Sequence, residues 1–344
     1  MSRTSVTIQD IAIHAGVGVG TVSRVLNDSP QVDPTTRQHV QAVITELGYR
    51  PKSAAKILRT RKTHEIGFIT DEIATTPFAV DVIRGAQDAA WAQGKLLVLI
   101  NTNRDAQMLE AAIETMLDRQ VEGIVYAAMF HQQVSLPANI YEVPAVLVDC
   151  FCAEQNLPSV VPDEVQGSYE ATELLLKQGH RRIGHMTNVE SYPAKHGRIQ
   201  GYKQALADYG VAFDPELITE EWTDPHGGYR AARRLLALED RPTAIFCFND
   251  RMAMGTYDLL HELGLRIPDD VAITSFDNQE LLAAHLRPPL TTMQLPHYAM
   301  GQWAVNYLLD PNNHNHESAP PQILLECPPI LRKSHQKEID PERG

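Results

Sequence analysis

Apolar residues recur at helical spacing in three short runs over the first 50 positions. The first run, 7–16, opens with Thr7 and Asp10 at the spacing of a capping box, and the second occupies 18–27. The third, 33–48, opens with aspartate and proline, a typical N-cap followed by the first helical residue. The side chains expected to face inward are Ile8, Ile11, Ala12, Val22, Val25, Leu26, Val40, Val43, Ile44 and Leu47. Three short helices around one apolar cluster predict a small all-α head.

Three glycines in "AGVGVGTVSRVL" separate the first two predicted helices. Gly16, Gly18 and Gly20 could cradle a phosphate, but such a loop needs an apolar strand before it and, in a P-loop, a Lys-Ser/Thr pair after it. Here a capped amphipathic helix precedes the glycines. We therefore interpret the stretch as the turn of a helix-turn-helix, with Gly16 as a left-handed cap on the first helix. The second helix of such a motif enters the major groove of DNA.

From Glu65 onward, continuous apolar segments alternate with helical ones. The expected strands are "EIGFIT", "KLLVLIN", "VEGIVYAA" and "VPAVLVD", then, after a break near 155–164, "RRIGHMT", "PTAIFCF" and "VAITSF". Strands that are apolar throughout, rather than at alternate positions, indicate parallel sheets covered on both faces. The pattern predicts an α/β body of two parallel-sheet lobes. In such folds, ligands bind at the carboxyl ends of the strands.

The net charge of −13 is unevenly distributed along the chain. Residues 1–65 hold nine basic and five acidic residues, whereas the remainder holds 21 basic and 38 acidic residues. Between Arg50 and Lys62 there are six basic residues and no acidic one, which suits a path along DNA phosphates. This asymmetry favours a polyanion-binding head on an acidic body, although a solvated basic linker would have the same charge.

An apolar edge interrupts this basic stretch. Ala54, Ala55, Ile57 and Leu58 fit one or two helical turns, and apolar side chains wedged between base steps kink DNA from the minor groove. Leu58 is therefore a candidate wedge; the alternative is a linker that only tethers. The patterns divide the chain into a head (1–50), a hinge helix or linker (51–64), a two-lobed body (65–335) and a tail (336–344).

The head and hinge resemble those of the lactose-repressor (LacI/GalR) family. The resemblance rests on "TIQDIAIHAGVGVGTVSRVLN" and "VDPTTRQHVQAVITELGYRPKSAAKILR", and it implies a dimer that reads operator half-sites, with the hinge leucine inserted in the minor groove. Gly18 departs from the family, which usually has a capping serine there. The resemblance implies operator choice through Val19 and Gly20. The expected DNA contacts are Thr7, Val19, Gly20, Thr21, Ser23, Arg24, Asn27, Ala55, Lys56 and Leu58.

Polar residues follow the predicted strands of the body at Asp71, Asp149, Asn188, Asn249 with Asp250, and Asp277. Each could be a helix cap, and we expect Asp250 to cap a helix that starts at Met252. Together with one arginine and aromatic rings, they suit a polyol, whose hydroxyls pair with carboxylates and amides and whose C–H face packs on a ring. The candidate effector-binding residues are Asp71, Phe78, Asp149, Arg198, Trp222, Asn249 and Asp277.

The body also resembles that of the same family and of type I periplasmic sugar-binding proteins. "GRIQGY", "FNDRMAMG" and "VAITSFDN" are similar to the effector-binding segments of sugar-responsive members, so Arg198, Asn249 and Asp277 carry over position by position. "RPPLTTMQLPHYAMGQWAVNYLL" is similar to the segment after the last core strand and its adjoining helix. The tail has no leucine heptad, so we expect a homodimer.

Composition excludes several other classes of protein. No apolar run approaches the ~18 residues of a spanning helix, and "MSRTSVTIQD" lacks the core of a signal peptide, so we expect a cytoplasmic protein without membrane contact. The four cysteines form no metal-ligand or redox pattern, and no serine elbow or His-x-x-x-His pair appears. We therefore expect no metal, no cofactor, no catalytic residue and no enzyme.

These observations predict a dimeric transcriptional repressor that binds palindromic operator DNA and responds allosterically to a small effector, expected to be a sugar. One alternative keeps the architecture but responds to a purine, a sugar phosphate or a partner protein. A second alternative is a solute-binding protein with an incidental basic head.

Overall fold

The computed structural model describes residues 6–49, 63–154, 156–314 and 319–336. The chain separates into two compact units, Met1–Thr63 and His64–Gly344. We call the described part of the first unit the head and that of the second unit the body, and we treat each by itself.

The head consists of three short helices, as expected: α1 (Ile8–His14), α2 (Val19–Leu26) and α3 (Pro34–Glu46). They enclose a core of eight buried side chains, namely Ile11, Ala12, Ala15, Val22, Val25, Val32, Val40 and Val43, with Ile8, Leu26, Ile44 and Leu47 packed at its edge. The apolar spacing in the sequence thus placed the inward face of all three helices correctly.

Caps at the helix ends explain why these short segments form helices. The backbone N–H of Thr7 donates to Oδ2 of Asp10 at 2.7 Å, and the N–H of Asp10 donates to Oγ1 of Thr7 at 3.3 Å, which completes the expected capping box. Asp33 caps α3 by accepting from the N–H of Thr36 at 2.9 Å. Gly16 has a positive φ of 62°, as expected for a residue that ends a helix.

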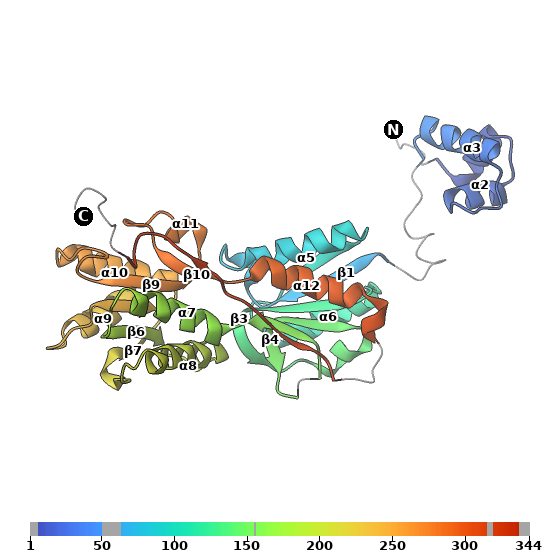
Figure 1. Cartoon of the computed structure of the whole chain (residues 1–344). Helices are drawn as coiled ribbons and strands as arrows, with labels where there is room; N and C mark the ends of the chain where they lie inside the picture. Colours follow the sequence, from blue (N-terminus) through green and yellow to red (C-terminus); the bar gives the residue numbers. More distant parts are fainter. Residues whose placement is uncertain (1–5, 50–62, 155, 315–318, 337–344) are drawn as a thin grey trace, which may run out of the picture. The chain divides into compact units, whose positions relative to one another are not determined.

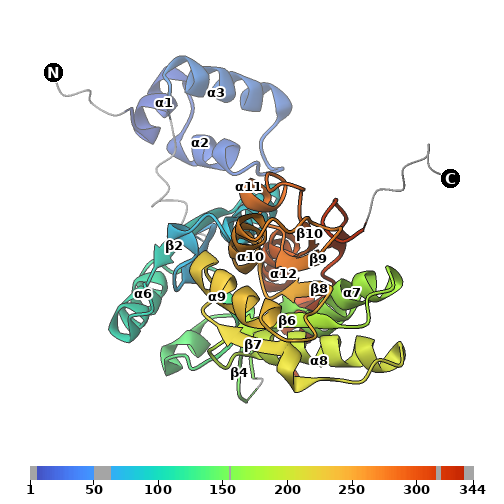
Figure 2. The same cartoon turned by 90° about the vertical axis from the view of Figure 1, so that its left-hand side faces the viewer.

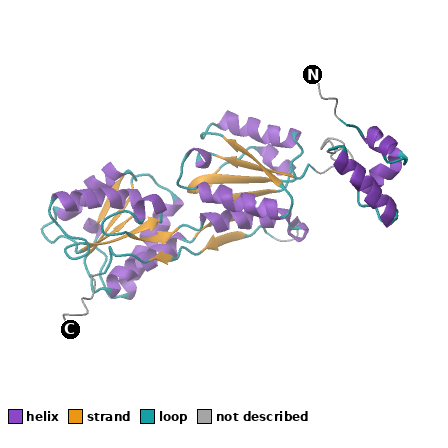
Figure 3. Ribbon diagram, turned by 90° about the horizontal axis from the view of Figure 1, so that it is seen from above, coloured by secondary structure: helices purple, strands orange, loops and turns teal. Residues whose placement is uncertain are grey.

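The body contains two six-stranded sheets, each flanked by helices on both faces (Figures 1 and 3). The first sheet has the order β2-β1-β3-β4-β5-β11 and is parallel throughout. Its strands are β1 (Glu65–Thr70), β2 (Leu96–Asn101), β3 (Ile124–Val134), β4 (Ala145–Cys152), β5 (Ser159–Pro162) and β11 (Gln322–Leu325). Helices α5 (Val80–Ala92) and α12 (His297–Leu309) cover one face, and α6 (Ala106–Asp118) covers the other. We call this part the N-lobe.

The second sheet has the order β12-β10-β9-β8-β6-β7, in which only the short β12 is antiparallel to its neighbour. Its strands are β6 (Ile183–Asn188), β7 (Ile218–Glu221), β8 (Ala244–Cys247), β9 (Ala272–Asp277), β10 (Thr291–Gln294) and β12 (Pro329–Ile330). Helices α7 (Glu164–Lys177) and α8 (Pro193–Asp208) lie side by side on one face (Figure 2), and α9 (Pro225–Leu236) and α10 (Asp250–Glu262) cover the other. We call this part the C-lobe.

Short elements complete the body. They are α11 (Glu280–Ala283) and four 3-10 helices, η1 (Ile73–Thr75), η2 (Ala138–Glu142), η3 (Pro215–Leu217) and η4 (Pro311–His314). Within the described residues, no helix is long and apolar enough to span a membrane. All four cysteines lie in the described part of the chain, where they are buried and free of disulfides.

The chain passes between the two lobes three times. It crosses at 162–164 between β5 and α7, at 294–297 between β10 and α12, and at 325–329 between β11 and β12. Two parallel-sheet lobes were predicted correctly, but the interpretation of 155–164 as a plain break was wrong. That segment contains β5, a buried strand of the first sheet too short to stand out from its prolines.

Candidate functional site

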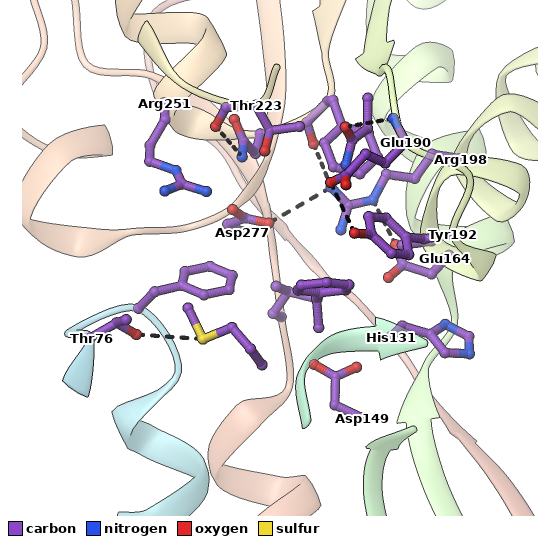
Figure 4. A pocket seen from close by; sticks show the side chains of 18 of the residues that line it. Thr76, His131, Asp149, Glu164, Glu190, Tyr192, Arg198, Thr223, Arg251 and Asp277 are labelled. Atoms are coloured by element: carbon purple, nitrogen blue, oxygen red, sulfur yellow. Dashed lines mark hydrogen bonds and ion pairs between the residues drawn. The ribbon is translucent and has the colours of Figure 1, made fainter. Parts of the chain in front are cut away.

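A cavity of about 300 Å³ lies between the N-lobe and the C-lobe at the carboxyl ends of their strands. The N-lobe contributes residues that follow β1 and residues within β3 and β4, and the C-lobe contributes residues at the ends of β6, β8 and β9. This is the position at which open parallel sheets bind ligands. Figure 4 shows the side chains that converge there from both lobes.

Arg198 on α8 is the central cation of the cavity and is only 3% exposed. Its Nε donates to Oε2 of Glu164 at 2.6 Å, and its Nη1 donates to the carbonyl oxygen of Phe248. The guanidinium also lies over two rings, 4.3 Å from the centre of Phe248 and 3.9 Å from that of Phe276. Burial alone would lower the pKa of Arg198, but Glu164 and Asp277 outweigh burial and raise it. The arginine is therefore permanently charged and rigidly held.

Asp277 ends β9 and points toward this arginine (Figure 4), with Oδ1 3.7 Å from Nη1 of Arg198. Its Oδ2 accepts from the side-chain amide of Gln279 at 3.1 Å. Burial raises the pKa of Asp277 to about 8, because desolvation exceeds the stabilisation that Arg198 gives to the carboxylate. Asp277 can therefore hold a proton near neutral pH and accept or donate a hydrogen bond.

Asp149 on β4 lies at the N-lobe side of the cavity and is 1% exposed. Its Oδ1 has no hydrogen-bond partner among the described residues, and its Oδ2 is 4.0 Å from Nε2 of His297. Burial, reinforced by the nearby charge of Glu164, raises the pKa of Asp149 well above its usual range. A buried carboxyl oxygen without a partner is costly, so this atom is available to a ligand that supplies one.

A bulge of four residues in β3 shapes the same side of the cavity. Ala127 pairs with Val148, and the next pair along the two strands is Gln132 with Cys150. Four residues of β3, 128–131, thus lie opposite the single residue Asp149, which takes a positive φ of 56°. Bulges aim side chains away from a sheet, and Met129, Phe130 and His131 of this bulge all line the cavity.

The seven predicted effector residues do not all meet at one place. Five of them line the cavity: Phe78, Asp149, Arg198, Asn249 and Asp277. Asp71 lies instead in a neighbouring cavity of about 240 Å³, where Gln132 donates to it at 3.3 Å. Trp222 is 53% exposed and does not line the cavity, whereas the next residue, Thr223, does.

Sequence reasoning missed several cavity residues. They include Arg104, Phe130, His131, Glu164, Glu190, Tyr192, Phe248 and Arg251. Phe248 and Arg251 flank Asn249, so the end of β8 gave a signal that could have identified them. Glu164 and Phe130 gave no such signal. Only folding brings Glu164, at the start of α7, to Arg198 and brings Phe130, in the β3 bulge, to the cavity.

Asn249, not Asp250, caps α10. Its Oδ1 accepts from the N–H of Met252 at 2.9 Å, and its side-chain amide donates to the carbonyl oxygen of Thr223 at 3.3 Å. The expectation that Asp250 is the cap was wrong. Asp250 is fully buried, accepts from Oγ1 of Thr292 at 2.7 Å and from the N–H of Gln279 at 2.6 Å, and so ties α10 to β10 and to the segment after β9.

The second candidate site is the outer face of α2 in the head. Val19, Gly20, Arg24 and Asn27 are exposed, and Thr21 and Ser23 are half-buried. Asn27 donates to the carbonyl oxygen of Ser23 at 2.6 Å, which orients its side chain along the helix. Thr7 is exposed but engaged in the capping box. The predicted contacts Ala55, Lys56 and Leu58 lie outside the described residues.

Two family models match the chain and together cover most of it. Residues 7–52 match the model described as bacterial regulatory proteins of the lacI family. Residues 63–327 match the model described as periplasmic binding proteins and sugar binding domain of the LacI family.

Curated relatives extend over almost the whole chain. The ribose operon repressor of Haemophilus influenzae is 33% identical over 95% of this chain and 98% of its own length. The HTH-type transcriptional repressor CytR of Escherichia coli K12 is 32% identical over 96% of this chain and 97% of its own. These relatives are transcriptional repressors and not enzymes, in agreement with the sequence analysis.

Solved structures agree in fold. A lac repressor dimer bound to operator and the anti-inducer ONPF has a TM-score of 0.81 at 25% identity, with 97% of this chain and 100% of that chain covered. A complex of the transcriptional regulator CelR with cellobiose has a TM-score of 0.68 at 29% identity, with 96% and 99% covered. On the strength of the family models and the full-length relatives, the chain belongs to the LacI family and is a DNA-binding transcriptional repressor.

Proposed function

We propose that this repressor acts as a homodimer on a palindromic operator and is controlled by a small neutral carbohydrate bound between its lobes. The cavity carries the proposal. It combines a fixed guanidinium, an oxygen of Asp149 that has no partner in the described part of the chain, the protonatable Asp277 and the rings of Phe78 and Phe248. The hydroxyl groups of a sugar can donate to the carboxyl groups of Asp149 and Asp277 and accept from Arg198, while the C–H face of the sugar packs on an aromatic ring.

The charge of the cavity favours a neutral ligand over a phosphorylated one. Arg198 is deeply buried together with three carboxyl groups, those of Glu164, Asp149 and Asp277. Two of the three have raised pKa values because burial and like charges disfavour ionisation. An added phosphate would bring further negative charge into this site, so a sugar phosphate is disfavoured. A purine could also stack on the rings of Phe78 and Phe248, so purines are included in the binding experiment.

DNA contact is proposed for the outer face of α2 and for the hinge. The exposed Val19, Gly20 and Arg24 would reach base edges or phosphates if α2 enters the major groove. Leu58 is proposed as the minor-groove wedge. We expect Leu58→Ala to weaken operator binding in a gel-shift titration and to leave the heat of effector binding as it is; unchanged operator affinity would contradict the wedge.

A dimer interface is proposed at the β2 edge of the N-lobe sheet. Trp91, Leu96, Leu99 and Met108 on β2 and on the helices before and after it are 70%, 54%, 37% and 46% exposed. We call these four residues the β2 patch. Large apolar side chains grouped around an unpaired strand edge are typical of a surface that another protein covers.

The deciding experiment is calorimetry of the full chain against neutral monosaccharides, cellobiose, nucleosides, purine bases and a sugar phosphate. A neutral sugar should give heat and the sugar phosphate should not. The same sugar should change operator affinity in a gel shift, typically by 5- to 150-fold for allosteric coupling. Heat only from nucleosides or purines would assign that class instead, and no heat from any of them would contradict a small-molecule effector.

Two variants locate the response. Arg198→Ala should abolish the effector response because it removes the central donor. Ala79→Gly changes a buried, apolar position of the N-lobe core that does not line the cavity, and it serves as a control for general destabilisation. An effector that still releases DNA from the Arg198→Ala variant would count against the cavity as its site.

A further inference from the structure

We infer that Phe130 and Tyr192 form the contact that closes the mouth of the effector cavity and restricts it to ligands of a single ring. This inference rests on the proposed function of the cavity. Phe130 belongs to the N-lobe and Tyr192 to the C-lobe, and their ring centres are 4.5 Å apart at an interplanar angle of 58°. Both residues line the cavity. The pair is thus a direct side-chain contact between the two lobes, in addition to the three chain crossings.

The β3 bulge produces this bridge from the N-lobe side. Because residues 128–131 are looped out opposite Asp149, Phe130 leaves the sheet and extends toward the start of α8. The same bulge brings Sδ of Met129 to 3.5 Å from Oγ1 of Thr76, which ties it back to the segment after β1. The contact of Met129 with Thr76 therefore anchors the backbone next to Phe130.

Polar groups hold both rings in place. On the N-lobe side, the guanidinium of Arg104 lies 5.1 Å from the ring centre of Phe130, and its Nη2 lies 3.0 Å from Oε2 of Glu72. On the C-lobe side, the hydroxyl of Tyr192 donates to Oε2 of Glu190 at 2.9 Å, and Tyr192 is itself the N-cap residue of α8. Arg104, Phe130 and Tyr192 thus form a continuous row of side-chain contacts across the cleft, and Glu72 and Glu190 line the cavity with them.

This row of contacts accounts for the small size of the cavity. A volume of about 300 Å³ is at the lower limit for small-molecule sites, and it holds one sugar ring with its hydroxyls more readily than two. A second ring could enter only if Phe130 and Tyr192 separated, which would forfeit their mutual contact. Aromatic pairs of this kind contribute enough to change an equilibrium about two- to tenfold. Phe130 and Tyr192 therefore act as specificity-determining residues through ligand size.

The test compares a monosaccharide with the disaccharide cellobiose on the full chain. The monosaccharide is the one that gives the largest heat with the unmodified protein. We expect cellobiose to bind that protein at least tenfold more weakly. Phe130→Ala, Tyr192→Ala and the double variant should bring the two affinities to within about threefold. Tyr192→Phe keeps the ring and should restore most of the preference, and Tyr141→Ala, an exposed tyrosine outside the cavity, is the matched control.

An unchanged preference in both alanine variants would overturn the inference. If the unmodified chain binds no neutral sugar, the proposed function fails, and a second measurement still decides on the closing contact. Amide hydrogen exchange in 248–251, a C-lobe segment that lines the cavity, should be faster in the double variant than in the unmodified chain without any ligand. Equal exchange there would mean that the two rings do not hold the cleft closed.

Discussion

At the scale of single residues, the body holds several ionisable groups in buried positions. Asp250 and Asp277 are buried and have pKa values raised to about 6 and about 8, chiefly because burial disfavours their charged forms. His185 and His297 are buried as well, and burial lowers the pKa of each to about 4. The raised pKa values of the two carboxyls make stability fall as pH rises, whereas the lowered pKa values of the two histidines make stability rise with pH.

Asp277→Asn tests the raised pKa of the Asp277 carboxyl. In the unmodified chain, folded Asp277 holds a proton up to a pKa of about 8 while the unfolded chain releases it near 4, so stability falls as pH rises through this window. The histidines act in the reverse direction only below about pH 6.5, where the unfolded chain takes up protons. Between pH 6.5 and 8, the variant should therefore lose less stability than the unmodified chain, by about 1–2 kcal/mol.

Urea unfolding of both proteins at pH 6.5, 7.2 and 8 measures the difference. Asp149 acts in the same direction, so the slope should decrease and not vanish. Asp270→Asn is the control, because hydrogen bonds from Arg266 lower the pKa of this half-exposed carboxyl and its stabilising effect is complete well below pH 6.5. Identical slopes for Asp277→Asn and the unmodified chain would show that Asp277 is already ionised at pH 6.5.

The residues of the site differ in how far the sequence could reveal them. Arg198, Asn249 and Asp277 stand in motifs at the ends of strands or on the following helix, so their convergence followed from the strand pattern. Asp71 also follows a strand, but a neighbouring strand and Arg104 draw it into a separate cavity. Trp222 is an aromatic residue of suitable type that points into solvent. Side-chain direction after a strand depends on local backbone angles, which residue type does not specify.

At the scale of elements, three helix pairs of the body approach so closely that only glycine fits. A methyl group on Gly301 of α12 would overlap the carbonyl oxygen of Val82 on α5, and one on Gly85 of α5 would overlap that of Tyr298 on α12. The pairs α7 with α8 and α9 with α10 repeat this arrangement at Gly201 and Gly228. Since α5 and α12 come from opposite ends of the body, no local pattern predicts their contact.

Gly301→Ala should therefore destabilise the body by about 1–3 kcal/mol or more, because the added methyl forces α12 away from α5. Helix propensity alone would favour alanine over glycine by about 1 kcal/mol, so the sign of the result is informative. Thermal unfolding followed by circular dichroism measures the effect. Gln302→Ala, at the next and half-exposed position of the same helix, is the matched control and should change stability much less.

The start of α2 carries a different kind of glycine. Gly18 is the N-cap, makes no side-chain capping bond, and has open space where a side chain would begin. Gly18→Ser should stabilise α2 by a few tenths of a kcal/mol by accepting a hydrogen bond from the first turn. Its hydroxyl should also add a phosphate contact and strengthen DNA binding.

A gel-shift titration at two salt concentrations measures the change in affinity. Gly18→Ala fills the same space without a hydroxyl and separates the effect of the cap from that of a methyl group. Equal DNA affinity for the serine and alanine variants would argue that the turn does not approach a phosphate.

Most elements of the fold could be predicted from the sequence. Capping residues and apolar spacing gave the three head helices, and continuous apolar segments gave β1 to β4, β6, β8 and β9. The segments that were missed are β5, β7, β10, β11 and β12, each of two to four residues. Strands this short depend on pairing with a neighbour, which lies far away in the sequence for β11 and β12. The β3 bulge was missed because it lies within a long apolar stretch.

At the scale of the whole molecule, the two edges of the N-lobe sheet are not alike. The β2 edge bears the β2 patch, whereas the opposite edge is the short β11, on which Leu324 is exposed. If the β2 patch forms the dimer interface, Leu96→Glu should place two charges within it and convert the dimer to a monomer at micromolar concentration. Sedimentation velocity measures the change, and operator affinity should fall with it.

Leu324→Glu introduces the same charge at the other edge of the same sheet. It should leave the sedimentation coefficient unchanged. A dimer that survives Leu96→Glu, or one that dissociates equally with Leu324→Glu, would contradict the assignment of the interface to β2.

The three chain crossings also determine the order in which a growing chain can fold. The head is complete within the first 50 residues, but the N-lobe sheet still needs α12 for one face and β11 for one edge. At about 5–20 residues per second, roughly 8–33 seconds pass on the ribosome between Pro162 and Leu325. Until α12 is synthesised within that interval, the face that Met300, Ala304, Val305 and Leu308 will cover is open to water. Both lobes are therefore finished almost together, at the end of synthesis, and the DNA-binding head is folded well before the body.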